Sequence, residues 1–371
     1  TPLGLRSLER WLTRHGTVAK IGVEGTGTYG LGLQRVLQAA GHEVVEVNRP
    51  NRQTRRARGK SDTIDAESAA RAVLAGHATA APKAHDGVVE SIRVLLVAYG
   101  SARRSIDRIG GQLRSLVVTA PEAIRIEFAG HDAKAIATKA SRLRPGEDCA
   151  DVTTATKTAL RMLARQYQAL TDDIGIIDAE LETLTTTANP GLRQVPGVGP
   201  IVAARLLVAA GDNPERLTSD AAFAALCGAS PIEASSGKTV RHRLNQGGNR
   251  QANHALWRIA MTRLMSDPRT KAYAQRRRAE GRSTREIIRC LKRYIAREIY
   301  RHLTDPQPPA APGPSLRERR LALNLTQTDI ATALGTQGQR ISNIETGYRA
   351  SAALTERYSA WLNQHEATCA A

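Results

Sequence analysis

The sequence is poor in cysteine and aromatic residues, and it has no long hydrophobic run. Its four cysteines (Cys149, Cys227, Cys290 and Cys369) lie far apart without a CxxC pair, and its nine histidines are scattered. This excludes a zinc-binding spacing and a disulfide framework, and free thiols are typical of a reducing cytoplasm. No apolar run approaches the roughly 20 residues that cross a bilayer, and no signal-peptide pattern is present. We therefore expect a cytoplasmic protein with no membrane partner.

Acidic residues are also scarce relative to basic ones. Lys and Arg number 53 against 35 Asp and Glu, which gives a net charge of +18 over 371 residues. A chain of this length is expected to form two or three domains. The positive balance favours a polyanionic partner, most simply DNA or RNA. The alternative is a basic protein with a solvated positive surface, but here the charge is clustered.

The few acidic residues near the amino end form a distinctive pattern. Glu24 lies in Val-Glu-Gly-Thr-Gly, and Asp62 and Asp65 lie in Lys-Ser-Asp-Thr-Ile-Asp-Ala. Between them lies a basic segment with Arg49, Arg52, Arg55, Arg56, Arg58 and Lys60. Carboxylates set among arginines suit a site shared by Mg²⁺ and phosphate. For Asp62 and Asp65 alone, the alternative is a capping box at a helix start.

The first 80 residues predict a βαβ unit. Residues 17–23 and 43–47 have strand patterns, and residues 29–40 have a helical pattern that ends at Gly41. The two strands are expected to be parallel, so that Glu24 lies at a carboxyl end, where α/β folds place their sites. A further helix is expected from Ser61 to about Leu74. The sequence opens at Thr1 within a predicted helix over residues 3–12, so we expect that the true amino terminus is missing.

Helical patterns dominate the rest of the chain. A small-residue linker over 77–86 precedes two long helices, 88–120 and 152–187, which predict an antiparallel hairpin or coiled coil; an ordinary helical bundle is the alternative. Either arrangement offers a dimer surface. A break at 189–191 leads into a helical region over 192–303. The Pro/Ala-rich residues 304–314 form the clearest domain boundary, and a compact helical module follows.

Two glycine-containing motifs lie in the helical region. Val-Pro-Gly-Val-Gly-Pro from Val195 resembles the turn of a helix-hairpin-helix module, whose backbone N–H groups approach phosphate; a bare turn between helices is the alternative. Ala-Ser-Ser-Gly-Lys-Thr from Ala234 is expected in a polar loop. It is not a P-loop, because Ile232 occupies the first glycine position and no strand is expected before it. Ser236 or Ser235 is a candidate nucleophile or phosphate contact; otherwise the loop is merely flexible.

The last third of the chain contains a basic stretch and a pattern typical of DNA-binding helices. Residues 269–301 are expected to be helical, with twelve cations and interleaved tyrosines, as expected for phosphate binding. Residues 316–323, 326–335 and 337–345 predict three short helices, of which the last is a recognition helix that begins with Gln337, Gln339 and Arg340. Their pattern closely resembles the lambda-repressor-like helix-turn-helix family. A small bundle that binds a protein is the alternative.

Together the motifs resemble a known family. The ordered set is Glu24-Gly-x-Gly, Lys60-Ser-Asp-x-x-Asp-Ala, Val195-Pro-Gly-Val-Gly-Pro, Ser235-Ser236-Gly237 and Gly247-Gly248-Asn249-Arg250. Over about residues 1–303 it is similar to the insertion sequence 110 transposases, also known as DEDD transposases or bridge-RNA-guided recombinases. The helix-turn-helix tail lies outside the shared core.

This resemblance implies a fold and an activity. The front is then an α/β, RNase-H-like (RuvC-like) domain in which Glu24, Asp62 and Asp65 match the last three members of an Asp-Glu-Asp-Asp set that binds Mg²⁺. The first Asp has no counterpart, which implies missing strands and an incomplete metal site. Ser236, or else Ser235, attacks DNA to form a covalent phosphoserine link. A structured guide RNA and a homo-oligomer (dimer or tetramer) with composite sites are further implications.

The expected domains are therefore a truncated RNase-H-like domain (1–80), a helical coiled-coil region (86–190), a helical transposase domain (191–303), a linker (304–314) and a helix-turn-helix domain (315–371). The residues expected to contact nucleic acid are Arg55, Arg56, Arg58, Lys60, Lys238, Arg241, Arg250, Arg277, Arg289, Gln337, Gln339 and Arg340. Two alternative functions stay open: a metal-dependent nuclease or resolvase without serine chemistry, and a non-enzymatic DNA-binding regulator. The expected location is the bacterial cytoplasm, in association with the nucleoid.

Overall fold

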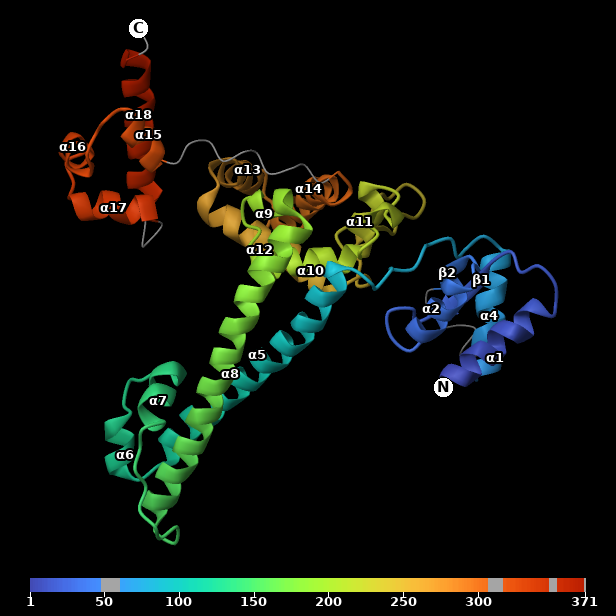
Figure 1. Ribbon diagram of the computed structural model, residues 1–371, viewed down its shortest axis with the longest axis horizontal. Helices are drawn as coiled ribbons and strands as arrows, with labels where there is room; N and C mark the ends of the chain where they lie inside the picture. The colour runs from blue at the N-terminus through green and yellow to red at the C-terminus, as the bar shows by residue number, and fades with distance from the viewer. Residues whose placement is uncertain (48–60, 306–315, 347–351, 370–371) are drawn as a thin grey trace. The chain divides into compact units, whose positions relative to one another are not determined.

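The computed structural model describes residues 1–47, 61–305, 316–346 and 352–369 (Figure 1). The chain divides into two compact units, Thr1–Pro306 and Gln307–Ala371. We describe each unit by itself. Helices predominate in both.

The front of the first unit is a small α/β region. Its elements are α1 (Pro2–Thr13), β1 (Ile21–Glu24), α2 (Leu31–Ala39), β2 (Val44–Val47) and α4 (Asp62–Leu74). The strands pair in parallel, from Ile21 opposite Val44 to Glu24 opposite Val47, which confirms the predicted βαβ unit. The first strand begins at Ile21 rather than at residue 17, because the ladder starts where the Ile21 N–H donates to the Glu43 carbonyl. Val23, Leu37 and Val44 form the core.

Helix α4 packs directly on β1. A Cβ at Gly22 would lie 2.8 Å from Val73 Cγ2 and 3.1 Å from the Ala69 carbonyl oxygen, so only glycine allows this approach. The helix therefore follows the strand closely, and its first turn carries Asp62 and Asp65.

The segment after α4 was predicted to be a plain linker, but several hydrogen bonds fix it to its surroundings. Ala80 pairs with Glu46 of β2, and Arg35 of α2 donates to the His85 carbonyl at 2.7 Å. The Lys83 ammonium donates to the Val208 carbonyl at 2.5 Å. Charged side chains among small residues therefore connect the α/β region to the helical domain.

Two long helices follow, α5 (Val88–Thr119) and α8 (Val152–Ala188). Ile92 of α5 lies in one apolar cluster with Leu181 of α8, whereas Leu113 lies in another with Leu160, so the helices run antiparallel. This matches the predicted antiparallel hairpin. Short helices α6 (Glu122–Glu127) and α7 (Ala133–Ala140), which the sequence analysis did not anticipate, cover its tip (Figure 1).

The base of the hairpin joins the helical domain. Its elements are α9 (Pro190–Gln194), α10 (Pro200–Ala210), the 3-10 turn η1 (Pro214–Arg216), α11 (Asp220–Leu226), β3 (Ile232–Glu233), β4 (His242–Arg243), α12 (Arg250–Ser266), α13 (Pro268–Ala279) and α14 (Thr284–Thr304). Leu206, Phe223, Leu256 and Ile299 lie in its core. The basic stretch predicted to be helical consists of two helices: Gly281 interrupts it at φ +79°, and Ser283 starts α14 with a capping box to Glu286.

The second unit is a small helical bundle of α15 (Leu316–Ala322), α16 (Gln327–Ala333), α17 (Gly338–Thr346) and α18 (Ala352–Cys369). Ile330, Ile341 and Tyr358 are fully buried in it. Arg320 and Glu345 form an ion pair at 2.7 Å, with side chains only 7% and 1% exposed. Across the described parts of both units, no helix is long and apolar enough to cross a membrane.

Candidate active site and nucleic-acid interface

Glu24 ends β1 at the carboxyl edge of the parallel sheet. The chain turns sharply after it: Gly25 has φ +69°, and a Cβ at Gly30 would lie 2.4 Å from the Glu24 carbonyl oxygen. Gly30 also donates its N–H to the Gly25 carbonyl at 3.0 Å. The glycines in this motif therefore serve the turn that follows the carboxylate.

Asp62 and Asp65 occupy the first turn of α4, but neither caps it. Ser61 is the N-cap, and its hydroxyl accepts a hydrogen bond from the Ile64 N–H at 3.3 Å. The third helical position is Ile64, so the alternative of a capping box is wrong. The two carboxylates still favour the positive end of the helix dipole. Asp62 is exposed and Asp65 is half-buried.

The three predicted metal ligands are not gathered into one cluster. Over the residues that the structure describes, no group of three His, Cys, Asp or Glu side chains is placed to hold a metal ion. Carboxylate oxygens suit Mg²⁺ chemically, but this arrangement is not an assembled site. Arg55, Arg56, Arg58 and Lys60, which we expected to bind nucleic acid beside it, lie outside the described residues.

A further carboxylate at this edge, Glu46, was missed from sequence. It lies opposite Val23 in β2, accepts from the Thr26 hydroxyl at 3.1 Å and pairs with Arg216 at 3.1 Å. Nearby, burial and the Arg216 charge lower the pKa of Lys83 to about 8. The signal available in the sequence was an acidic residue within the apolar run Val-Val-Glu-Val. Its partner Arg216 is 170 residues away, and no local pattern indicates it.

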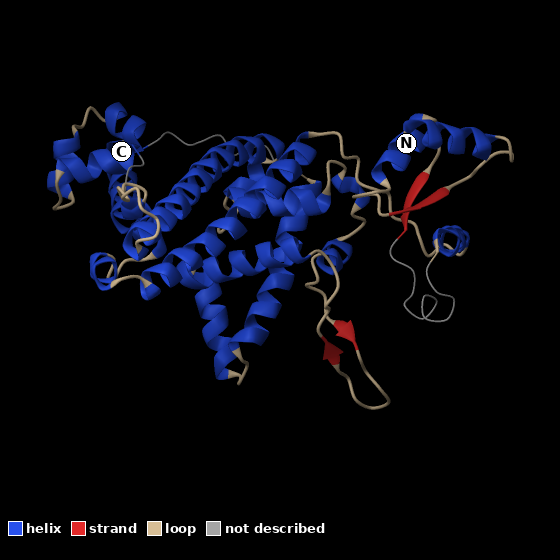
Figure 2. Ribbon diagram, turned by 90° about the horizontal axis from the view of Figure 1, so that it is seen from below, coloured by secondary structure: helices blue, strands red, loops and turns tan. Residues whose placement is uncertain are grey.

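The candidate serines lie on a β-hairpin, not in an irregular loop. The two-residue strands β3 and β4 pair antiparallel (Figure 2), so a short strand does precede the motif, contrary to expectation. Ser236 and Thr239 exchange backbone hydrogen bonds at 3.1 Å around Gly237, whose φ is +56°. All residues from Pro231 to Leu244 are exposed. The motif thus forms the turn of a projecting hairpin.

The hairpin separates the two serines. The Ser235 hydroxyl accepts from the Arg241 N–H at 3.2 Å and faces the Arg241 carbonyl at 3.4 Å, so it spans the two strands. The Ser236 hydroxyl forms no hydrogen bond to any of the described residues. Lys238 and Arg241 are exposed on the same hairpin. Ser236 is therefore the serine whose hydroxyl is available to a ligand.

Close backbone contacts at two glycines fix the foot of the hairpin to the helical domain. A Cβ at Gly248 (φ +82°) would lie 2.6 Å from the Leu226 carbonyl oxygen, and one at Gly228 (φ +61°) would lie 2.7 Å from the Gly247 carbonyl oxygen. Asn249 then caps α12 by accepting from the N–H groups of Gln251 and Ala252. Arg250 is the exposed first residue of that helix.

The turn from Val195 to Gly199 joins α9 to α10. Gly197 has φ +85° and a Cβ there would contact Ile259 at 3.4 Å. Arg263 donates to the Pro196 carbonyl at 2.9 Å, and Arg193 donates to the Val198 carbonyl. Two arginines therefore hold the carbonyls of this turn in place, and phosphate binding by its N–H groups stays a prediction.

The predicted basic residues of α13 and α14 differ in their surroundings. Arg277 pairs with Glu280, and Arg293 and Arg297 both pair with Asp220, whose pKa they lower. No described carboxylate pairs with the exposed Arg289. Arg289 is therefore the more available cation, while Arg277 belongs to a local ion pair.

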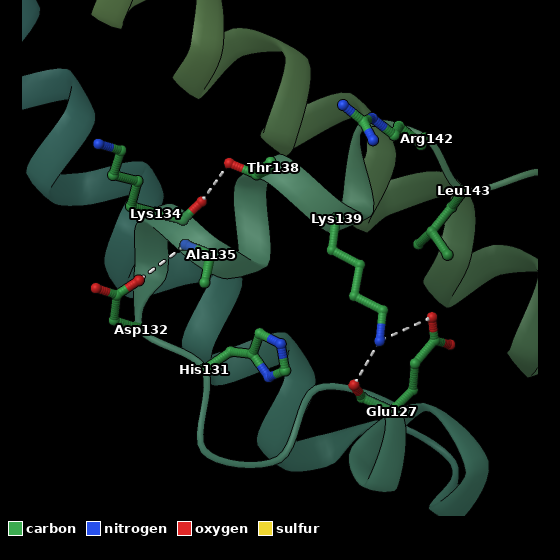
Figure 3. Close-up of a pocket in the computed structure, with 9 residues that line it drawn as sticks. All are labelled: Glu127, His131, Asp132, Lys134, Ala135, Thr138, Lys139, Arg142 and Leu143. Carbon is green, nitrogen blue, oxygen red and sulfur yellow. Dashed lines mark hydrogen bonds and ion pairs between the residues drawn. The ribbon is translucent and has the colours of Figure 1, made fainter.

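The described residues of the first unit line several cavities. One, of about 610 Å³, lies at the foot of the serine hairpin between its second strand and α14. Another, of about 670 Å³, is a shallow hollow on α6 and α7 at the tip of the helical hairpin of α5 and α8 (Figure 3). There Lys139 bridges to the backbone and carboxylate of Glu127, and Asp132 caps α7. Glu127, Asp132 and Lys139 of this hollow thus already have partners within the chain, whereas no described carboxylate pairs with Lys134 or Arg142.

In the second unit, the predicted reading residues lie at the start of α17. Gln337, Gln339 and Arg340 are all exposed, and Gln339 donates to Asn343 at 3.1 Å. Arg340 also borders a hollow of about 520 Å³ with Arg357. The buried Arg320–Glu345 pair holds α15 against α17 and so supports this helix.

Comparison with known proteins agrees with these features. Residues 1–120 match a DEDD transposase family of the IS110 type, residues 190–275 match the "Transposase IS116/IS110/IS902 family", and residues 316–355 match a helix-turn-helix family. The chain thus carries the domains of an IS110-family transposase, followed by a helix-turn-helix domain, and the resemblance seen in the motifs is confirmed.

Two curated proteins show the same kinship. An uncharacterized 43.6 kDa protein of insertion element IS110 from Streptomyces coelicolor is 31% identical over 138 residues, which are 36% of this chain and 34% of that protein. An uncharacterized 42 kDa protein of insertion element IS900 from Mycobacterium paratuberculosis is 25% identical over 151 residues, 40% of this chain and 38% of that protein. The matched part thus spans just over a third of each relative.

Proposed function

We propose that this chain is the transposase of an insertion sequence, which cleaves and rejoins DNA with Ser236 as nucleophile. The observation that carries the proposal is the joint presence of both transposase domains with an exposed serine hydroxyl at a hairpin turn beside Lys238 and Arg241. Cations next to a hydroxyl favour the approach of a phosphodiester and stabilise the charge that develops on it.

The proposed step is a transfer of the phosphoryl group. The Ser236 Oγ bonds to the phosphorus, the bond from phosphorus to the 3′ oxygen breaks, and that oxygen leaves as a hydroxyl after taking up a proton. The serine proton passes to a base. Rejoining is the reverse attack by a 3′ hydroxyl on the phosphoserine. The bond energy is conserved in the link, so the step needs no external energy source.

We further propose that Glu24, Asp62 and Asp65 bind Mg²⁺ in an RNase-H-like domain. A Cβ at Gly22 would lie 3.1 Å from the Ala69 carbonyl oxygen, so β1 and α4 approach closely here, and Asp65 lies one helical turn, about 6 Å, before Ala69. Glu24 lies about 7 Å along its strand from Gly22. A bound divalent cation would polarise the phosphate. Among the described residues these side chains do not form an assembled metal site.

The partners proposed are DNA, a structured guide RNA and further copies of the chain. A net charge of +18 favours more than one polyanion, and exposed apolar residues Val94, Val97 and Ile176 on α5 and α8 offer surface for a second copy. A composite site across two copies would allow the serine of one to meet the carboxylates of another.

The test is a covalent adduct. Labelled element-end DNA is incubated with the chain and Mg²⁺, and protein–DNA species that survive denaturing electrophoresis are quantified. We expect an adduct whose modified peptide contains Ser236, and its loss in Ser236→Ala. Cleavage that needs Asp62 but survives both Ser236→Ala and Ser235→Ala would instead indicate a nuclease or resolvase without serine chemistry.

The helix-turn-helix unit supports a second, non-exclusive role as a sequence-specific binder of the element ends or of its own promoter. It has its own apolar core and three exposed side chains at the start of α17. Arg340→Ala is expected to weaken binding by about 1–3 kcal/mol at one base position if Arg340 reads a base edge. A uniform loss across sequences would show that Arg340 contacts only a phosphate.

A further inference from the structure

The cavity at the foot of the serine hairpin has the chemistry of a nucleotide site. It is lined by the cations Arg243, Arg289, Lys292 and Arg293, and none of the described residues that line it is acidic. Arg293 forms an ion pair with Asp220, whereas no described carboxylate pairs with Arg289 or Lys292. These two cations therefore suit an anionic ligand.

The rest of the lining is largely apolar and includes an aromatic ring. Leu244 is 54% exposed and Tyr294 is 57% exposed, and Pro231 and Ala229 also line the cavity. Tyr294 packs edge-to-face against Tyr273, with ring centroids 5.9 Å apart, so its ring has a fixed support. A phosphate alone needs neither about 610 Å³ nor an apolar lining. A base with its attached phosphate uses both the cationic and the apolar side chains.

The floor of the cavity is preorganised. Asn253 donates to the carbonyls of Cys227 and Gly228 at 2.7 and 3.2 Å, and its own oxygen accepts from the Lys292 ammonium at 2.9 Å. This one amide thus joins α11, α12 and α14 and fixes the lysine. A site whose cation is already held loses little conformational entropy on binding.

We infer that this cavity holds one unpaired nucleotide of the DNA strand on which the serine hairpin acts. The base would lie against Tyr294 and Leu244, and its phosphate would lie on Arg289 and Lys292. Pro231, which lines the cavity, is five residues from Ser236, or at most about 17 Å along an extended strand. This inference rests on the proposed function and adds to it a requirement for local strand opening next to the cleaved bond.

Two matched pairs of variants of the full chain test the inference. Ser230 lines the cavity and is half-buried, so Ser230→Trp fills the space, while Ser230→Ala leaves it open. Tyr294→Ala removes the ring, and Tyr294→Phe keeps it. Binding of a labelled oligothymidylate, an oligouridylate and a duplex is followed by fluorescence anisotropy, and thermal unfolding reports on the fold of each variant.

We expect Ser230→Trp and Tyr294→Ala to weaken oligothymidylate binding roughly ten-fold, within the range for loss of one stacked base. Ser230→Ala and Tyr294→Phe should bind as the unmodified chain does, and duplex binding should not change. Equal affinities within both pairs would overturn the inference, as would equal losses on single strand and duplex. If Ser230→Trp unfolds the chain, the Tyr294 pair decides.

Preference for oligouridylate with the same sensitivity to Ser230→Trp would overturn the assignment to DNA and favour RNA. Failure of the proposed function has a separate signature, because it appears as the absence of an adduct at Ser236 whatever the Ser230 and Tyr294 variants do.

Discussion

The acidic edge of the front sheet and the serine hairpin both present reactive groups on short two-stranded sheets, but they are supported differently. Glu24 ends a parallel strand whose neighbours are packed helices and a small apolar core. Ser236 lies on an exposed antiparallel hairpin that is held at its foot by backbone contacts at Gly228 and Gly248. The first site thus depends on tertiary packing, and the second depends on two close backbone contacts.

The largest effect is expected at the hairpin turn. Ser236→Ala should reduce covalent adduct formation at least ~1,000-fold, because the nucleophile has no substitute in its position. Ser235→Ala is the control and should retain most of the activity, since Ser235 is engaged with Arg241 across the strands. Adducts are measured by denaturing electrophoresis and peptide mapping. An adduct that depends on Ser235 and survives in Ser236→Ala would reverse the assignment.

The next effect tests the foot of the hairpin. Gly248→Ala should lower the free energy of unfolding by about 2–4 kcal/mol, since its Cβ would meet backbone atoms at 2.6 and 2.7 Å. Gly237→Ala is the matched control, because Gly237 also has a positive φ but has nothing within 4 Å. It should cost about 1 kcal/mol. Urea unfolding measures both; equal losses would show that the close approach does not hold the hairpin.

The packing beside the acidic edge can be tested at Lys83, whose ammonium donates to the Val208 carbonyl of the helical domain. Burial lowers the pKa of the Lys83 ammonium from 10.5 to about 8, so between these pH values the folded chain binds fewer protons than the unfolded chain. Its contribution to stability therefore rises with pH over this window, by about 3 kcal/mol at most. Urea unfolding at several pH values should show this rise relative to Lys83→Met. Parallel curves for the two proteins would contradict it.

The smallest effects are expected at two glutamates of the α/β region, Glu46 and Glu43. Glu46→Gln should lower the free energy of unfolding by about 1–2 kcal/mol, because its partner Arg216 has a side chain only 9% exposed. Glu43→Gln, at an exposed pair with Lys20, should cost less than about 0.5 kcal/mol. Thermal unfolding measures both variants. A larger loss in Glu43→Gln would show that Glu46 does not join the sheet to the helical domain.

Elements with a strong local signal were predictable. The periodicity of α5 and α8, the βαβ unit and the three first helices of the tail agree with the structure, since each follows from residue spacing alone. The helix break at Gly281 and the short hairpin at Ile232 were missed. At Gly281 a positive φ interrupts the helix, and at Ile232 only two residues of each strand pair. Neither feature produces a periodic pattern of apolar residues in the sequence.

The sites divide in the same way. The exposed hydroxyl of Ser236 and the first-turn position of Asp62 and Asp65 follow from local sequence. The Glu46–Arg216 pair and the cavity beside Tyr294 were not predictable, because their members come from segments far apart in the chain. The convergence of Glu24 with the α4 carboxylates stays a prediction.

The proposed metal site of the front domain requires that convergence. Fe²⁺ in place of Mg²⁺, with ascorbate and element-end DNA, generates hydroxyl radicals that cut the polypeptide next to a bound metal. We predict backbone cuts near both Glu24 and Asp62, and their loss in Asp62→Asn. Cuts confined to other parts of the chain, or cuts unchanged by Asp62→Asn, would contradict the claim that these carboxylates share one cation.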